Sequence, residues 1–170
     1  MIQRNTFKLS IITALAFSFL SSPVLAQQKL KEQLVGTWTY VASVAKRNDG
    51  AKVDRWGTNA KGLAIFGADG RYSFMISRSD IPKFAVNNVT QGTAQENKAV
   101  MNGVIAHFGT WSVDEATKTL NTTIEAASFP NLNGVSQKRV ISTLTADELK
   151  YTNSATATGS IDEVSWKRAK

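Results

Sequence analysis

The sequence predicts an all-β protein, an eight-stranded antiparallel up-and-down barrel with one short helix around residues 93–102. Beyond residue 34 the chain consists mostly of short runs in which apolar and polar residues alternate, which is typical of strands with one buried face. Turn-forming residues separate these runs at intervals of roughly 10–15 residues, as in antiparallel sandwiches and barrels. Strands do not alternate with helices of comparable length, which excludes an α/β fold. Closure into a barrel is favoured because it leaves no exposed sheet edge.

Eight segments carry the strand pattern. They are rich in β-branched and aromatic residues, and clusters of Gly, Asn, Asp or Pro separate them. A tight hairpin is expected at residues 67–70, because glycine at both ends permits positive φ, and a turn is expected at residues 48–50. The predicted strands cover residues 35–45, 62–66, 71–77, 104–113, 119–127, 135–144, 149–155 and 161–168.

The first strand follows a polar lead-in, residues 27–34, that is long enough for about one turn of helix. Strict alternation along this strand predicts that Trp38, Tyr40 and Ala42 share one face and that Ser43 lies on the other.

The segment of residues 80–106 interrupts the strand rhythm. Its first half contains Pro82 and Gly92 and is expected to be irregular. Thr93 and Glu96 then have the spacing of a capping box, which predicts that a short helix begins there, over the mouth of a pocket.

The first 26 residues have the three parts of a secretory signal peptide. Arg4 and Lys8 precede an uncharged apolar run at residues 9–20, and Pro23 and a small-residue site ending at Ala26 follow it. Twelve residues of helix reach about 18 Å, which is short of the ~30 Å needed to cross a bilayer. We therefore expect cleavage after Ala26, a single mature domain over residues 27–170, a periplasmic or secreted location and no integral membrane segment.

Composition excludes several kinds of chemistry. The chain has no cysteine and one histidine, so disulfides, thiolate chemistry and multi-histidine metal sites are excluded. Its formal charge of +7 comes from scattered basic residues and not from a block, so we expect no nucleic-acid partner. No nucleotide-binding or metalloprotease motif occurs, and we expect no cofactor and no metal.

Five ordered segments resemble the bacterial and fungal lipocalin-like domain family, which belongs with the calycin barrels. They are LVGTW (34–38), GLAIFGADGRYSFMI (62–76), HFGTWSVDEATKTL (107–120), FPNLNGVSQKRV (129–140) and WKR (166–168). The resemblance implies an eight-stranded barrel around an apolar cavity. It also implies that Trp38 closes the base of the barrel and that Arg168 packs across the Trp38 ring, as structural and not ligand-binding residues.

The candidate ligand-binding residues are aromatic, apolar or basic side chains on the expected strands. A barrel of eight strands can hold one small ligand, and these side chains would form its wall. The candidates are Tyr40, Tyr72, Phe74, Met75, Trp111 and Arg139.

Three residues are candidates for acid–base chemistry: His107, Tyr72 and Glu125. His107 is the only imidazole, and it is otherwise interpreted as a histidine satisfied by its neighbours or facing solvent. Glu125 and Arg139 flank the turn at Pro130 and could face each other across a hairpin, as a buried pair, as a carboxylate site or as an exposed pair.

These observations favour an exported module that holds a small hydrophobic or amphipathic molecule in its barrel, by binding rather than by catalysis. The alternatives are a cofactor-free isomerase or cyclase that uses the same cavity, and a structural envelope protein without a cavity.

Overall fold

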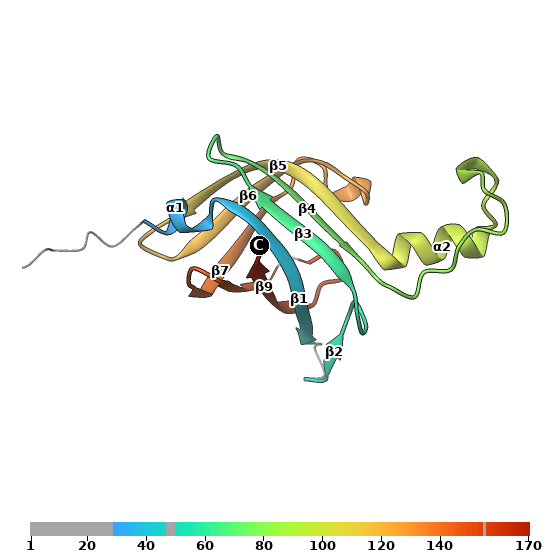
Figure 1. The fold of residues 1–170 in the computed structure, drawn as a ribbon, viewed down its shortest axis with the longest axis horizontal. Helices are drawn as coiled ribbons and strands as arrows, with labels where there is room; N and C mark the ends of the chain where they lie inside the picture. The colour runs from blue at the N-terminus through green and yellow to red at the C-terminus, as the bar shows by residue number, and fades with distance from the viewer. Residues whose placement is uncertain (1–28, 47–49, 155) are drawn as a thin grey trace, which may run out of the picture.

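The computed structural model describes residues 29–46, 50–154 and 156–170 (Figure 1). The predicted signal peptide lies outside the described residues, as do residues 48 and 49 of the expected turn.

The predicted antiparallel barrel is confirmed. Eight strands pair with their neighbours in chain order, and the sheet closes because β1 pairs with both β3 and β9. The short strand β2 is an addition that pairs with the far end of β1. The strands are β1 (Gly36–Lys46), β2 (Lys52–Asp54), β3 (Lys61–Phe66), β4 (Arg71–Ser77), β5 (Val104–Asp114), β6 (Thr119–Ala127), β7 (Ser136–Leu144), β8 (Glu148–Asn153) and β9 (Ile161–Arg168).

The prediction of strict alternation along β1 is wrong beyond Tyr40. The pairing with β9 shifts by one residue between Tyr40 and Ala42, so Val41 and Ala42 both face outward. An extra residue in one strand reverses the face of every residue that follows it. Ser43 consequently points into the barrel, opposite to the sequence prediction.

The expected hairpin between β3 and β4 is confirmed. The backbone N–H of Gly67 donates to the carbonyl of Arg71 at 2.7 Å, and Gly70 adopts a φ of +83°. A side chain is rarely accommodated at that φ, so glycine is required at this corner.

The helix predicted around residues 93–102 is confirmed as α2 (Ala94–Gly103). Thr93 accepts a hydrogen bond from the backbone of Glu96, whose side chain accepts one from the backbone of Thr93, so the capping box is complete. With η1 (Val89–Gln91), this helix belongs to the long connection between β4 and β5, which projects beyond the barrel (Figure 1).

One end of the barrel is closed by α1 (Leu30–Leu34) and Arg168. Leu34 is fully buried, and its carbonyl accepts a hydrogen bond from the indole N–H of Trp38 at 2.9 Å. The Arg168 guanidinium lies 4.0 Å from the Trp38 ring centroid and donates to the carbonyls of Gln33, Val35 and Ala146. Ligand access at this end is therefore blocked by packed side chains.

Aromatic side chains fill the barrel core next to this closed end. Tyr40 meets Trp166 edge to face with centroids 5.5 Å apart, and Phe66 meets Trp111 in the same way at 5.2 Å. Among the described residues, no helix has the length and apolar character required to cross a bilayer.

Candidate functional site

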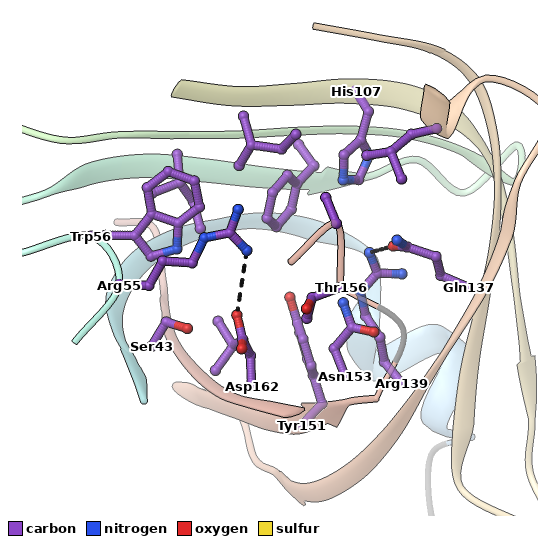
Figure 2. A pocket seen from close by; sticks show the side chains of 16 residues that line it. Ser43, Arg55, Trp56, His107, Gln137, Arg139, Tyr151, Asn153, Thr156 and Asp162 are labelled. Atoms are coloured by element: carbon purple, nitrogen blue, oxygen red, sulfur yellow. Dashed lines mark hydrogen bonds and ion pairs between the residues drawn. The ribbon is translucent and has the colours of Figure 1, made fainter. Parts of the chain in front are cut away.

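A cavity lies inside the barrel at the end opposite Trp38 and Arg168. Its volume is about 50 Å³, which is more than one water molecule needs. Apolar and polar side chains surround it (Figure 2), and they come from six strands and from connections that include η2 (Pro130–Leu132). The lining residues are Ser43, Arg55, Trp56, Phe74, Ile76, Ile105, His107, Leu132, Gln137, Arg139, Tyr151, Asn153, Thr156, Ala157, Asp162 and Val164.

Arg139 is a buried cation on the wall of this cavity. On β7 it alternates with the exposed Lys138 and Val140, so it points inward and is only 3 % exposed. Its Nη1 donates to the Thr122 hydroxyl at 2.5 Å and its Nη2 to the Gln137 side-chain oxygen at 2.6 Å. Both acceptors are neutral. No carboxylate in the part of the chain that the structure describes forms an ion pair with Arg139.

His107 lies on the neighbouring wall, where β5 pairs with β4. Its ring is stacked on Phe74, the residue opposite it in the register. Its Nδ1 is 3.0 Å from the Tyr72 hydroxyl, which forms a buried hydrogen bond. Burial and, secondarily, the positive charge of Arg139 lower the pKa of His107 to about 3. The imidazole is therefore neutral at physiological pH.

An ion pair between Arg55 and Asp162 lies at the mouth of the cavity. Arg55 lies 3.8 Å from Asp162 and 4.8 Å from the Trp56 ring centroid. Asp162 also accepts a hydrogen bond from Ser160 at 2.6 Å. Figure 2 shows this pair on one side of the cavity and Arg139 with Gln137 on the other, with Tyr151 between them. The carboxylate of Asp162 is thus engaged by Arg55 and Ser160.

A groove of about 380 Å³ continues from the mouth toward the C-terminal end of α2. It shares Arg55, Trp56, Ile105 and Ala157 with the cavity. Its remaining lining residues are mainly apolar: Met101, Asn102, Val104, Phe129 and Thr158. A molecule that enters the cavity therefore finds next to it a surface that combines apolar side chains with Arg55, Asn102 and Thr158.

Two of the six predicted ligand-binding residues, Phe74 and Arg139, line the cavity. Tyr72 does not line the cavity, but its hydroxyl contacts His107, which does. The Met75 side chain is on the outer face of β4 and is 47 % exposed, because it alternates with the inward-facing Phe74 and Ile76.

The other two predicted ligand-binding residues, Tyr40 and Trp111, belong to the packed core. Tyr40 is packed against Trp166, and burial is the main cause that raises its pKa. Trp111 donates its indole N–H to the Gly67 carbonyl at 3.0 Å, at the β3–β4 hairpin.

Of the three acid–base candidates, the structure brings His107 and Tyr72 together and leaves Glu125 apart. Glu125 lies on the outer face of β6 and forms a bidentate ion pair with Arg71, which lowers the pKa of Glu125. The expected facing pair of Glu125 and Arg139 does not form, because the β6–β7 register places Leu120 opposite Arg139.

Several lining residues were missed by sequence reasoning, notably Arg55, Trp56 and Asp162. Asp162 could have been found, since it has the same parity in the strand as Val164 and Trp166, which places all three on the inner face of β9. Arg55 and Trp56 lie between β2 and β3, where no periodicity indicates a direction. Among the described residues, no group of three or more His, Cys, Asp or Glu could hold a metal ion.

The model of the lipocalin-like domain family matches residues 35–169. The chain belongs to this family. The match begins just before β1 and ends just after β9, so it spans the whole closed barrel and includes the cavity.

Solved structures with similarity to this lipocalin-like barrel include designed proteins. A redesigned β-barrel, b11L5F_LGL, has 14 % identity and a TM-score of 0.44, and the alignment covers 85 % of this chain and 98 % of that one. A fluorescence-activating β-barrel designed de novo has 11 % identity, a TM-score of 0.44 and coverages of 84 % and 99 %. The redesigned barrel mFAP1, bound to DFHBI, has 16 % identity, a TM-score of 0.41 and coverages of 83 % and 100 %. No curated protein matches the chain.

Proposed function

We propose that this lipocalin-like barrel binds a small, mainly apolar molecule whose inner end enters the cavity and whose remainder lies in the adjoining groove. The observation that carries the proposal is a cavity inside a closed barrel, with Phe74, Ile76 and Val164 on its wall. The opposite end of the barrel is closed by Trp38 and Arg168, so the mouth at Arg55 and Trp56 is the route for a ligand.

The volumes of the cavity and the groove indicate which part of a ligand each could hold. The cavity of about 50 Å³ is far below the ~300–1,000 Å³ of typical ligand pockets, whereas the groove of about 380 Å³ is within that range. A small terminal group fits inside, and an apolar body fits in the groove against Trp56 and Phe129. Removal of apolar ligand surface from water stabilises the complex by about 25 cal/mol per Å² before ordering costs.

A fluorescent apolar probe tests this function directly. N-phenyl-1-naphthylamine is neutral, and its emission rises when it leaves water. We expect saturable binding to the mature protein, and we expect Ile105→Trp, a substitution at the junction of cavity and groove, to weaken it by about tenfold or more.

The matched control is Ile65→Trp, since Ile65 lies on the outer face of β3 and is 44 % exposed. This variant should bind the probe like the unmodified protein. No saturable binding at all would refute the function, and unchanged binding by Ile105→Trp would show that the probe binds elsewhere.

Binding is favoured over catalysis in this cavity because the pKa of His107 is low. His107 and Tyr72 are within hydrogen-bonding distance, as a catalytic pair would require. A pKa of about 3, however, makes the imidazole a weak base at neutral pH, where a general base works best with a pKa near the ambient pH.

We further propose that the protein acts after export, in the periplasm or outside the cell. The support is the arrangement of charge, apolar run and small-residue site in residues 1–26. N-terminal sequencing of the protein from culture fractions should give Gln27 as the first residue. A cell-associated chain that retains residues 1–26 would contradict this proposal.

A further inference from the structure

We propose that the ligand of this barrel carries a carboxylate, and that Arg139 binds it at the inner end of the cavity. This inference rests on the proposed function, because it assigns the chemical class of the molecule that the cavity would hold: an amphipathic monocarboxylate with an apolar tail.

The first support is the burial of Arg139 without a countercharge. Arg139 is only 3 % exposed, so its guanidinium has lost nearly all contact with bulk water, and a buried charge is unfavourable unless it is paired. Its hydrogen-bonding neighbours in the structure, Thr122, Gln137 and Tyr151, are neutral. The hydrogen-bond acceptors of a threonine and a glutamine do not require a charged donor, whereas an anionic ligand would pair with the positive charge of the guanidinium.

The second support is the charge of the cavity wall. The charged lining residues are Arg55, Arg139 and Asp162, which leaves one net positive charge. Asp162 is held by Arg55 and Ser160, and so the cation without an ionic partner is Arg139. The two other titratable lining groups are neutral at pH 7: burial lowers the pKa of His107 and raises that of Tyr151.

The third support is the way in which Arg139 is held. The hydrogen bonds to Thr122 and Gln137 fix two of the five N–H donors of the guanidinium, and the Tyr151 ring lies 5.7 Å from its carbon. A planar guanidinium held in this way is preorganised for the two parallel hydrogen bonds that a carboxylate accepts. Preorganisation reduces the ordering cost of binding.

The groove determines the rest of the ligand. It begins at Arg55, Trp56, Ile105 and Ala157, which also line the cavity, and it continues over Met101, Val104 and Phe129. A chain that starts at Arg139 and leaves through the mouth therefore meets Met101, Val104 and Phe129, beside the polar Asn102 and Thr158. This arrangement suits a carboxylate at one end of an apolar tail rather than an inorganic anion.

A matched pair of ligands tests the carboxylate without altering the protein. Octanoate and octan-1-ol share an apolar tail and differ in the charge of the head group. In calorimetric titrations of the mature protein at pH 7.5, octanoate should bind about tenfold more tightly or better, as a charge-assisted hydrogen-bonded pair requires.

Three variants locate the effect. Arg139→Met should abolish the preference for octanoate while octan-1-ol still binds, and Arg139→Lys, which keeps the charge but loses the planar fork, should reduce the preference. Arg71→Met is the control, since Arg71 lies on the outer face in an ion pair with Glu125. It should leave both affinities unchanged. Circular dichroism establishes that each variant is folded.

The outcomes separate the two proposals. If octan-1-ol binds and octanoate binds no better, the carboxylate assignment is wrong and the apolar site stands. If the unmodified protein binds octanoate tightly and Arg139→Met or Arg139→Lys retains the full preference, another cation binds the head group and the assignment to Arg139 fails. If neither ligand nor the neutral naphthylamine binds, the proposed function fails, and this inference fails with it.

Discussion

The imidazole of His107 lies parallel to the phenyl ring of Phe74, with centroids 4.5 Å apart and an interplanar angle of 9°. The two residues are direct neighbours across β4 and β5, so their rings form one continuous surface on the cavity wall. Burial on this wall and, secondarily, the positive charge of Arg139 keep the imidazole neutral, and its Nδ1 lies 3.0 Å from the Tyr72 hydroxyl.

The first prediction concerns the dependence of the free energy of unfolding on pH. The unfolded chain protonates His107 near pH 6.5, whereas the folded pKa is about 3. Because the unfolded state binds the proton more strongly, this residue's contribution to the free energy of unfolding is complete above pH 6.5 and is lost as the pH falls toward 3. Between pH 7 and pH 5 we expect a loss of about 2 kcal/mol in urea unfolding.

The control for this pH effect is His107→Asn, whose amide can replace the hydrogen bond to Tyr72 without titrating. His107 is the only histidine of the chain, so the variant should show a much flatter dependence between pH 7 and pH 5. An equally steep loss in both proteins would contradict a buried neutral imidazole.

The second prediction concerns the closed end of the barrel. Arg168→Lys keeps the charge but cannot donate to three carbonyls in three directions while it covers the Trp38 ring. We expect the free energy of unfolding to fall by about 2 kcal/mol, measured by urea titration. The neighbouring Lys167 is exposed, and Lys167→Met should change stability by less than about 0.5 kcal/mol. An unchanged Arg168→Lys variant would show that this contact does not stabilise the barrel.

The third prediction concerns Gly109, at the irregularity in the β5–β6 pairing. A Cβ at this position would lie 2.0 Å from the Thr123 carbonyl oxygen, which is part of the backbone of the adjacent strand. Gly109→Ala should therefore destabilise the protein by more than about 2 kcal/mol.

The comparison for Gly109 is Gly50→Ala. No atom lies within 4 Å of a Cβ there, and only the positive φ of +82° opposes the substitution, at a cost of about 1 kcal/mol. Thermal unfolding of both variants measures the difference. Similar melting temperatures would contradict the close approach of β5 and β6 at Gly109.

The fourth prediction concerns the connection between β4 and β5. Thr93→Ala removes the side chain that caps α2 and should cost about 1 kcal/mol of local stability. Hydrogen exchange should become about fivefold faster in the α2 amides and remain unchanged in the barrel strands. Thr39→Ala, on the outer face of β1, is the control and should not affect α2. Exchange that accelerates across the whole barrel would show that α2 does not open independently.

The barrel was predictable from sequence because its determinants are local. Alternation identified the strands, glycine identified the β3–β4 hairpin, and the Thr93–Glu96 spacing identified the start of α2. The pattern failed at Tyr40, where a bulge reverses the faces of Ser43 and the residues beyond it. A bulge adds one residue without any change in composition, so alternation alone cannot locate it.

The candidate site was predictable only in part, for the same reason. Phe74 and Arg139 were identified as wall residues, but Met75 was grouped with them although it points outward. Arg55 and Trp56 lie between strands, where side-chain direction has no period. Glu125 and Arg139 flank one turn, but the β6–β7 register places Leu120 opposite Arg139, and Glu125 forms a side-chain ion pair with Arg71 on the outer face.

The sequence by itself determined that this chain forms antiparallel strands with one apolar face and a capped helix, since each depends on neighbouring residues. The tertiary structure decided which inward side chains meet. His107 on β5, Arg139 on β7 and Asp162 on β9 are far apart in sequence and line one cavity, because closure of the sheet and its register bring their strands around a common interior. Pairing between distant strands sets that register, and no local pattern encodes it.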